Sequence, residues 1–401
     1  MPDTMTNEEF IHLHRDDDVR RLALKRMPEG VDAQWCLQQI EGRQLAQRKL
    51  PRWAAADGLW FPPRLAMEQC SGEATALYKR RIIERLLSDA ADRETLADLT
   101  GGYGVDFSYM APLFAQACYV ERQEELCRIA RHNFPLLCLG DAEVVCAEAE
   151  EWAKRPARLS LAYLDPARRD NADRKVVALE DCSPNAASLQ DTLLDRSTLT
   201  LTKLSPMLDI RMAMRKLKDV REVHVVSVRG ECKELLLVQG KPPAESTMVH
   251  CVNLGSDDPD VVCPMEKGLA AQAKLCDGMG DFLYEPNASI LKAGVQDFVA
   301  VSHGLEKLHR DSHLYTGDRR VEDFPGRSFM VEGCCSFGKR ELREMLKDIR
   351  QANITVRNFP ATAAQLRTRL KLKEGGNTYL FATTASDGRH LLVKCRKVAA
   401  P

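Results

Sequence analysis

The chain has 401 residues, of which 44% are hydrophobic, and its formal net charge at pH 7 is −1. This length provides two or three domains with a sizeable core, and the near-neutral charge excludes a whole-protein attraction to nucleic acid or membranes. Any such preference must come from a local patch. No run of about 18 apolar residues is present, so we expect no membrane-spanning segment.

The 14 cysteines occur singly in apolar segments, apart from the adjacent pair Cys334 and Cys335. No C-x-x-C motif occurs and no cysteine–histidine spacing suggests metal ligands, so we predict no bound metal. The first residues, MPDTMTNEEFIHLHRDDD, lack the apolar stretch of a secretory signal. Scattered free thiols are typical of a reducing compartment, and we therefore expect a cytoplasmic protein. The oligomeric state is not indicated.

Residues 1–90 are expected to be helical and to form an amino-terminal domain. Three of the four tryptophans occur here among basic residues: Trp35, Trp53 and Trp60 with Arg43, Arg48, Lys49 and Arg52. These side chains form either a surface where rings and cations meet a nucleotide or a small helical core with a solvated basic face. The sequence leaves both interpretations open.

Residues 91–240 alternate between short apolar runs and segments long enough for helices. The runs are LADLT (96–100), ACYVE (117–121), AEVVCA (142–147), SLAYLD (160–165) and LTLTKL (199–204). This alternation predicts a parallel sheet with helices on both faces, a Rossmann-like α/β fold. After the fifth run, Ser205 and Pro206 predict the start of a helix. Two β-rich runs at 222–240 predict a closing antiparallel hairpin, which is characteristic of class I methyltransferases.

The glycine-rich stretch LADLTGGYGVDFSYMAPLF (96–114) predicts a strand, a sharp turn and a helix that opens near Asp106. It is neither the dinucleotide fingerprint G-x-G-x-x-G nor a P-loop. Its early acid, Asp98, suits the ammonium group of S-adenosylmethionine. The predicted cofactor contacts in this stretch are Asp98, Thr100, Gly101, Gly102, Gly104 and Asp106.

Two further acids follow the next strands at the spacing that one cofactor needs. Glu121 ends the second strand, where a carboxylate accepts both ribose hydroxyls, as it also does in NAD enzymes. Glu148 follows the third strand, within reach of an adenine amino group. A plain tight turn is the alternative for the glycines alone, but the set of glycines and acids favours a cofactor site.

The fourth strand ends in LDPARRD, and its carboxyl end belongs to the edge where ligands bind in parallel sheets. Pro166 stiffens the turn and directs Asp165 toward a substrate amine or hydroxyl. Arg168 and Arg169 are predicted to grip a phosphate or carboxylate, or else to pair with surface acids. We predict Asp165, Pro166 and Arg168 as catalytic residues, and Arg169 and Lys203 as substrate contacts.

Several longer motifs carry a family resemblance. DLTGGYGVD and LDPARRD resemble motifs I and IV of class I S-adenosylmethionine-dependent methyltransferases. EQCSGEATALYK (68–79), KLSPMLDI (203–210), ECKELL (231–236) and LYEPNASILKAG (283–294) resemble one bacterial family of such enzymes over nearly the whole chain. The resemblance implies an amino-terminal helical part, a Rossmann-like core, a small ferredoxin-like segment and a carboxy-terminal THUMP-like domain.

The resemblance also implies that Gln69, Ser71 and Thr75 close over the cofactor. THUMP-type domains accompany enzymes that modify structured RNA, so an RNA base is the implied acceptor. One departure matters, because enzymes that methylate exocyclic amines carry Asp/Asn-Pro-Pro and an aromatic residue that stacks on the flipped base. Ala167 and Arg168 stand at those positions here. This puts methylation of an exocyclic amine in doubt.

The segment from Lys339 to Lys373 contains ten Lys/Arg residues and three acids. Its pattern predicts a βαβ unit with a basic edge suited to RNA phosphates, or a solvated helix face. Arg367, Arg369 and Lys371 are the predicted RNA contacts in this segment.

We expect four domains: 1–90 helical, 91–240 Rossmann-like, 241–325 a linker and ferredoxin-like segment, and 326–401 THUMP-like. The favoured function is S-adenosylmethionine-dependent methylation of a base in rRNA or tRNA. The alternatives are a small-molecule or protein acceptor, and an RNA-binding protein with a relic cofactor pocket. A dehydrogenase is disfavoured by the hairpin and the glycine spacing.

Overall fold

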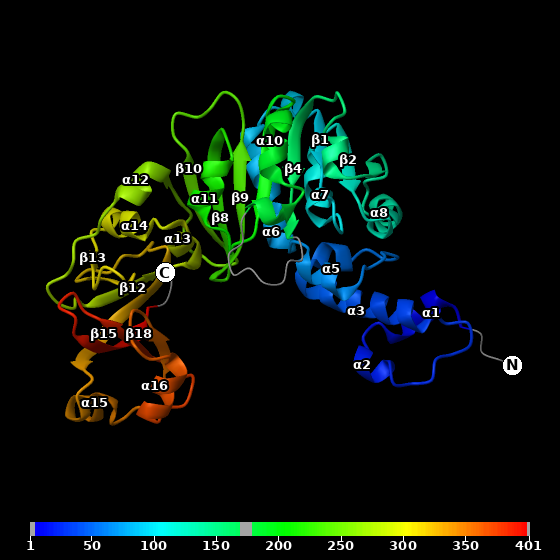
Figure 1. Cartoon of the computed structure of the whole chain (residues 1–401). Coiled ribbons are helices and arrows are strands. Elements are labelled where there is room, and N and C mark those ends of the chain that lie inside the picture. Colours follow the sequence, from blue (N-terminus) through cyan, green and yellow to red (C-terminus); the bar gives the residue numbers. More distant parts are fainter. Residues whose placement is uncertain (1–4, 169–178, 399–401) are drawn as a thin grey trace. The chain divides into compact units, whose positions relative to one another are not determined.

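The computed structural model describes residues 5–168 and 179–398. Its contacts divide the chain into two compact units, which Figure 1 traces from the amino to the carboxyl terminus. The first unit comprises Met1–Arg221 with Leu236–Ala244, and the second comprises Glu222–Leu235 with Glu245–Pro401.

The first unit begins with a helical segment, as the sequence predicts, and the described residues of this segment form six α-helices. They are α1 (Asn7–His14), α2 (Val19–Leu22), α3 (Ala33–Lys49), α4 (Pro51–Ala54), α5 (Arg64–Gln69) and α6 (Glu73–Leu86), followed by a 3-10 turn at Ala90–Asp92. Thr6 and Glu9 form a capping box at the start of α1, and Asp32 caps α3. These caps satisfy main-chain N–H groups that the first turn of a helix leaves without partners.

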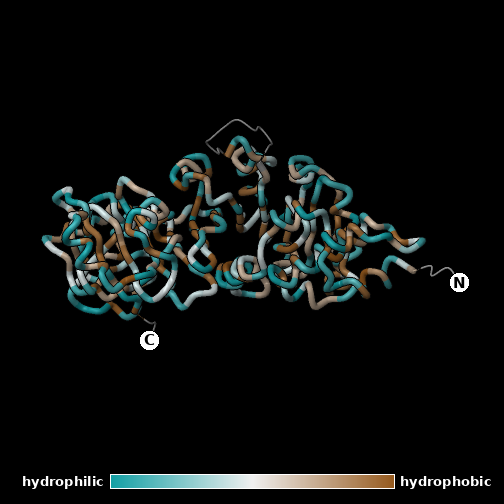
Figure 2. The backbone as a smooth tube through the Cα atoms, turned by 90° about the horizontal axis from the view of Figure 1, so that it is seen from below, coloured by the Kyte–Doolittle hydropathy of each residue, from teal (hydrophilic) through white to brown (hydrophobic). Residues whose placement is uncertain are grey.

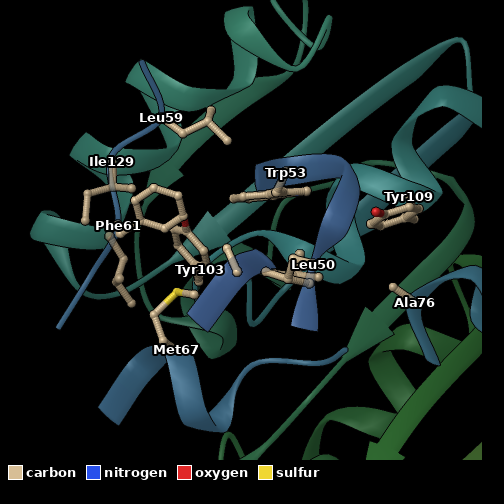
Figure 3. Packing of buried hydrophobic residues seen from close by; sticks show 12 residues of the cluster. Leu50, Trp53, Leu59, Phe61, Met67, Ala76, Tyr103, Tyr109 and Ile129 are labelled. Carbon is tan, nitrogen blue, oxygen red and sulfur yellow. The ribbon is translucent and has the colours of Figure 1, made fainter. Parts of the chain in front are cut away.

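The later helices of this segment share a hydrophobic core with the helices that follow the glycine loop. Figure 3 shows Trp53 of α4 among Leu50, Phe61 and Tyr103. Trp53 is 1% exposed, and its indole N–H donates to Ser108 Oγ. The core interpretation therefore holds for Trp53, and segment 1–90 does not pack as a separate body.

The other two tryptophans of the segment are partly exposed. Trp60 stacks on His132 with 3.9 Å between ring centroids, and the Arg128 guanidinium lies over the indole of Trp60. Trp35 and Trp60 line a cavity of about 140 Å³. This volume is too small for a nucleotide, since ligand pockets usually measure about 300–1,000 Å³.

A nine-stranded sheet has the strand order β11-β10-β8-β9-β7-β4-β1-β2-β3. The strands are β1 (Thr95–Asp98), β2 (Gln116–Glu121), β3 (Glu143–Cys146), β4 (Leu159–Leu164), β7 (Ser197–Leu204), β8 (Val220–Val228), β9 (Glu231–Gln239), β10 (Met248–Leu254) and β11 (Val261–Pro264). The pairs from β3 through β2, β1 and β4 to β7 are all parallel. Every residue of β4 is buried, as expected for a strand covered on both faces.

The helices between these strands are α7 (Val105–Met110), α8 (Glu124–Leu136), α9 (Ala149–Trp152), α10 (Ala186–Leu194) and α11 (Ile210–Lys216), with 3-10 turns at Ala111–Leu113 and Leu179–Asp181. A short ladder pairs β5 (Ala167–Arg168) with β6 (Cys182–Ser183). The predicted hairpin is confirmed as β8 and β9. They are joined by Arg229 and Gly230, both at positive φ, as a tight hairpin turn requires.

One predicted helix start is wrong. Helix α11 begins at Ile210, five residues after Ser205, and its cap is Asp209, which accepts a hydrogen bond from the N–H of Met212. Ser205 and Pro206 instead lie in a turn between β7 and α11. Ser205-Pro206 and Asp209 both precede apolar residues at helical spacing, so both are possible helix starts. In the structure, the helix starts after Asp209.

The second unit contains a seven-stranded sheet of order β13-β14-β12-β15-β18-β17-β16. Its strands are β12 (Phe282–Pro286), β13 (Glu306–Lys307), β14 (Tyr315–Gly317), β15 (Gly326–Ser336), β16 (Asn353–Val356), β17 (Thr378–Thr384) and β18 (His390–Lys397). The helices are α12 (Met265–Ala270), α13 (Ala288–Ala293), α14 (Gln296–Ser302), α15 (Lys339–Leu346) and α16 (Ala363–Leu370). Parallel β16 and β17 flank α16 and form the predicted βαβ unit.

Both faces of this smaller sheet are buried. Neighbouring residues of β17 enter different hydrophobic clusters, with Phe381 in one and Leu380 and Ala382 in the other. This follows from the alternation of side chains along a strand. Figure 2 shows that hydrophobic stretches alternate with hydrophilic ones along the chain in both units.

The first part of segment 241–325, expected as a linker, contains folded strands. Its first strands, β10 and β11, extend the large sheet, because β10 pairs in parallel with β8 and β11 pairs antiparallel with β10. The Pro/Gly/Asp-rich stretches around them are turns within a folded region. Among the described residues, no helix has both the length and the apolar content needed to cross a membrane.

Candidate active site

The glycine loop follows β1 and lies directly on the ring of Tyr119 in β2. The Gly101 N–H donates to the Val120 carbonyl at 2.8 Å, and the Tyr119 hydroxyl donates to the Gly102 carbonyl. A Cβ atom at Gly101 would lie 2.1 Å from Tyr119 Cε2. Gly104, at φ 84°, precedes α7 in the left-handed region that favours glycine. The absence of side chains therefore lets the loop pack closely against Tyr119, with Gly101 and Gly102 partly buried and Gly104 buried.

Asp98 ends β1 and is 1% exposed. Its Oδ1 accepts a hydrogen bond from the Thr100 N–H at 3.0 Å. Burial raises the pKa of this carboxyl well above its usual value, and the nearby acids Asp106, Asp165 and Glu121 raise it further. In such surroundings, a bound cation would stabilise the ionised form of the carboxylate.

Glu121 ends β2 and is also buried. Its two oxygens accept hydrogen bonds from the N–H groups of Gly102 at 2.9 Å and Gln123 at 2.8 Å. These bonds fix the carboxylate beside the glycine loop. Glu148 lies two residues beyond β3, immediately before α9, and its side chain is exposed.

Thr100 joins the glycine loop to the turn after β4. Its Oγ1 accepts a hydrogen bond from the Asp165 N–H at 2.5 Å, and the N–H of the preceding Leu99 donates to the Tyr163 carbonyl. The two neighbouring strands β1 and β4 therefore end at the same place. The structure brings Asp98, Thr100 and Asp165 together, as the order of the strands predicts.

Lys203, on β7, extends this group of residues. Its Nζ lies 2.5 Å from Asp165 Oδ2, 3.2 Å from Ser71 Oγ and 4.0 Å from Asp106 Oδ2. The predicted catalytic acid and one predicted substrate contact thus form an ion pair. The side chains of Lys203 and Asp165 are 13% and 34% exposed, so a substrate can still approach the carboxylate.

Asp106, on α7, lies at the centre of a buried polar network. It accepts hydrogen bonds from Ser71 Oγ at 2.6 Å and the Tyr163 hydroxyl at 2.8 Å, and it pairs with Lys79 Nζ at 3.1 Å. Burial opposes its charge, but Lys79, Lys203 and these hydroxyl groups lower its pKa to about 2. Asp106 therefore stays ionised and links the amino-terminal helices to the site.

Lys79 and Tyr163 are members of this network that the sequence analysis missed. Lys79 is 0% exposed, on a face of α6 that also carries Ala76, Ile82 and Ile83. The sequence did contain a signal for Lys79, because it occurs at helical spacing among apolar residues. A lysine on a buried helix face almost always has a partner, which indicates a buried polar network.

The remaining predicted contacts lie apart from these polar interactions or outside the described residues. Gln69 is exposed at the end of α5, and Thr75 Oγ1 donates to the Gly72 carbonyl within α6. Pro166 follows Asp165 and is partly exposed. Arg168 lies in β5, where its main chain pairs with Cys182, and Arg169 lies outside the described residues.

The predicted RNA contacts all belong to the second unit. Arg367 is partly buried and pairs with Glu374 at 3.2 Å. Arg369 is exposed, with its guanidinium over the ring of Phe337, and Lys371 is exposed at the carboxyl end of α16.

The fold and these residues define the class of the protein. Strands β3-β2-β1-β4-β7 form a parallel core, the β8–β9 hairpin contributes two more strands beyond β7, and a glycine loop with acids follows the first two strands. The glycine cradle and the buried Asp98 fit the amino acid part of S-adenosylmethionine. Together they specify a class I S-adenosylmethionine-dependent methyltransferase.

The comparisons with known proteins identify the family. Over 98% of both chains, the protein is 34% identical, with a TM-score of 0.86, to the crystal structure of a candidate methyltransferase from Porphyromonas gingivalis W83. It is 26% identical over 355 residues to an uncharacterized S-adenosylmethionine-dependent methyltransferase of Mycobacterium tuberculosis H37Rv, covering 86% of this chain and 90% of that protein. The chain belongs to this family of S-adenosylmethionine-dependent methyltransferases, and the predicted enzyme class and cofactor are confirmed.

Two family models match the end of the chain. One, described as a ferredoxin-like domain, matches residues 282–325, and the other, described as THUMP domain-like, matches residues 326–397. The two small modules implied by the resemblance are therefore present. Strand β12 begins the first match and β15 begins the second.

Proposed function

We propose that this methyltransferase modifies a base in a structured RNA of the cytoplasm, such as rRNA or tRNA. The observation that carries the RNA acceptor is the exposed positive charge of the THUMP-like domain. Of the ten Lys/Arg residues between Lys339 and Lys373, eight are exposed and two, Arg357 and Arg367, are partly buried. Arg357 forms an ion pair with Glu285, and Arg367 forms one with Glu374.

The exposed cations follow the helices of this domain. Lys339, Arg340 and Arg343 lie on α15, while Arg369 and Lys371 lie at the carboxyl end of α16. Cations in such numbers suit the phosphates of folded RNA and give a salt-dependent affinity. The fourteen free thiols support the cytoplasmic location, because thiols remain reduced there.

At the cofactor site, we assign Asp98 to the ammonium group and Glu121 to the ribose hydroxyls of S-adenosylmethionine. Gly101, Gly102 and Gly104 provide the main-chain cradle, and Glu148 reaches the adenine. When bound, this cofactor supplies an electrophilic methyl group. Held by the Thr100 bond, Asp165 orients the acceptor and takes up its proton.

The departure from the Asp-Pro-Pro-aromatic motif limits which atom of the base can accept the methyl group. Asp165 and Pro166 are followed by Ala167, which is exposed and has no ring to stack on a flipped base. We therefore favour an acceptor other than an exocyclic amine.

The test is methyl transfer from labelled S-adenosylmethionine to purified rRNA and tRNA fractions. Arg369→Glu with Lys371→Glu should weaken RNA binding at least tenfold and leave S-adenosylhomocysteine binding unchanged. Lys274→Glu with Arg310→Glu is the matched control, because both residues are highly exposed in the same unit outside the THUMP-like match.

The alternative functions give different results. If the Arg369/Lys371 variant methylates and binds RNA like the control, the basic surface is not an RNA site and a small-molecule or protein acceptor is favoured. RNA binding without affinity for S-adenosylhomocysteine would indicate a relic cofactor pocket.

A further inference from the structure

Two histidines and a glutamate converge on neighbouring strands of the second unit. Strands β8 and β10 pair in parallel, with His224 directly opposite His250 and Glu222 opposite Met248. Side chains two residues apart point to the same face of a strand. Glu222 and His224 therefore share the face of the sheet on which His250 lies.

The potential ligand atoms of these three residues lie close together. His224 Nε2 is 2.9 Å and His250 Nε2 is 3.8 Å from Glu222 Oε2. One ligand atom from each residue can be chosen so that all three lie within 4.8 Å of one another. The two imidazole rings lie 4.3 Å apart between centroids, with 17° between their planes.

We propose that Glu222, His224 and His250 bind one divalent transition-metal ion, with Zn²⁺ as the best match. Two neutral imidazoles and one carboxylate form a known zinc ligand set, with Zn–N distances of about 2.0–2.1 Å and Zn–O distances of about 2.0–2.2 Å. A tetrahedral site with such bonds places ligand atoms about 3.3 Å apart. The distances of 2.9 Å and 3.8 Å from the two Nε2 atoms to Glu222 Oε2 lie on either side of that value.

Small side-chain rotations complete the geometry. Both Nε2 atoms lie within 3.8 Å of the same carboxylate oxygen, and rotation about the χ2 angles would direct their lone pairs toward one ion. Water would fill the remaining coordination position from the side of Glu222 and His250, whose side chains are 11% and 15% exposed, whereas His224 is 1% exposed.

The kinds of side chain also favour a metal ion, because imidazole nitrogens offer lone pairs and the carboxylate offers an anionic oxygen. The ion would hold β8 to β10 at a point where β10 extends the large sheet.

The test uses tag-free full-length protein, dialysed against a chelator and titrated with Zn²⁺ at pH 7.5. We expect one equivalent to bind with micromolar or tighter affinity and to raise the melting temperature. His250→Gln and, separately, His224→Asn should weaken the affinity at least tenfold. At pH 5.5 the affinity should also fall, because protons compete for the imidazoles.

A control separates this site from the thiols. Cys334→Ser with Cys335→Ser removes the adjacent cysteine pair and should leave Zn²⁺ binding intact. Co²⁺ bound at the proposed site should show d–d absorption bands without a thiolate charge-transfer band.

The proposal is overturned if folded wild type binds no Zn²⁺, or if binding survives His250→Gln. Loss of binding in the cysteine variant alone would also overturn it. His250→Gln keeps the test decisive if the more buried His224 cannot be replaced.

Discussion

Lys203 Nζ lies 2.5 Å from Asp165 Oδ2, although 38 residues separate them along the chain. They meet because β4 and β7 are neighbouring parallel strands. The ammonium group is close enough to Ser71 and Asp106 to connect Asp165 with the buried polar network. We therefore infer that Lys203 is a positioning residue, which fixes the orientation of the carboxylate that we assign to the acceptor.

We predict that Lys203→Met lowers the rate of methyl transfer by about 10²–10³-fold, the range lost when a positioned catalytic group is removed. Without the ion pair, the Asp165 carboxylate loses the contact that fixes its orientation. The affinity for S-adenosylhomocysteine should change less than threefold, since Asp98 and Glu121 remain. Labelled methyl incorporation and calorimetric titration measure the two effects.

A conservative variant distinguishes positioning from general stability. Lys203→Arg keeps the positive charge and should recover part of kcat, with an altered pH profile. Equal losses in the Met and Arg variants, or a matching loss of cofactor affinity, would contradict the positioning role.

Asp98 provides a second prediction, in which stability and function move in opposite directions. Its pKa is raised in the folded protein above the usual 3.8, chiefly by burial. The folded state therefore holds this proton more tightly than the unfolded state, and stability declines as the pH rises through the raised pKa. Asp98→Asn should stabilise the ligand-free protein at pH 7.5 by on the order of 1 kcal/mol, and the gain should vanish below about pH 4.

The same variant should lose the cofactor response. At 100 times the dissociation constant, a ligand stabilises wild type by about 2.7 kcal/mol. S-adenosylhomocysteine should therefore raise the melting temperature of wild type and not that of Asp98→Asn. A shift of equal size in both proteins would remove Asp98 from the cofactor site.

How much of the site was predictable depends on how local its determinants are. The edge of the sheet could be predicted because Asp98, Glu121 and Asp165 each follow an apolar run directly, and parallel strands align their ends. The Lys203–Asp165 pair and the link from Lys79 to Asp106 could not, since they depend on which strands are neighbours and on how α6 packs against α7. Nor did any cysteine–histidine spacing indicate Glu222, His224 and His250, which meet only through the register of β8 and β10.

The start of α11 illustrates the same limit. Ser205-Pro206 and Asp209 are both acceptable beginnings for a helix, and local preference does not choose between them. Leu208 is 2% exposed between the two candidates, whereas Met207 is 72% exposed. Burial of Leu208 in the turn is a tertiary effect, and propensity is a weak guide where tertiary packing intervenes.

Asp106 gives a prediction about acid stability. Its folded-state pKa is about 2, below the usual 3.8. The stabilisation by this carboxylate is therefore complete above about pH 4 and is lost as the pH falls through about 2. We expect Asp106→Asn to lower the free energy of unfolding at pH 6 by about 3–5 kcal/mol, because it leaves the buried Lys79 without its carboxylate.

Urea unfolding of both proteins between pH 6 and pH 2 measures this difference. The gap should narrow by on the order of 2 kcal/mol toward pH 2. Asp106→Asn with Lys79→Met should recover part of the loss at pH 6, since the unbalanced ammonium is then gone. A gap that is independent of pH would show that Asp106 contributes through packing rather than charge.

Gly101 tests the cradle of the cofactor loop. A Cβ atom there would lie 2.1 Å from the ring of Tyr119, which is 0% exposed and bonded to the Gly102 carbonyl. The ring cannot withdraw without moving the loop. Gly101→Ala should therefore cost about 1–3 kcal/mol of stability and weaken S-adenosylhomocysteine binding at least tenfold.

Gly140→Ala is the control, because a Cβ atom there meets nothing within 4 Å, and it should change stability by less than about 0.5 kcal/mol. Adding Tyr119→Leu to Gly101→Ala removes the ring edge and should restore part of the affinity for S-adenosylhomocysteine. If Gly101→Ala behaves like Gly140→Ala in urea unfolding and in calorimetric titration, the loop does not depend on its close approach to Tyr119.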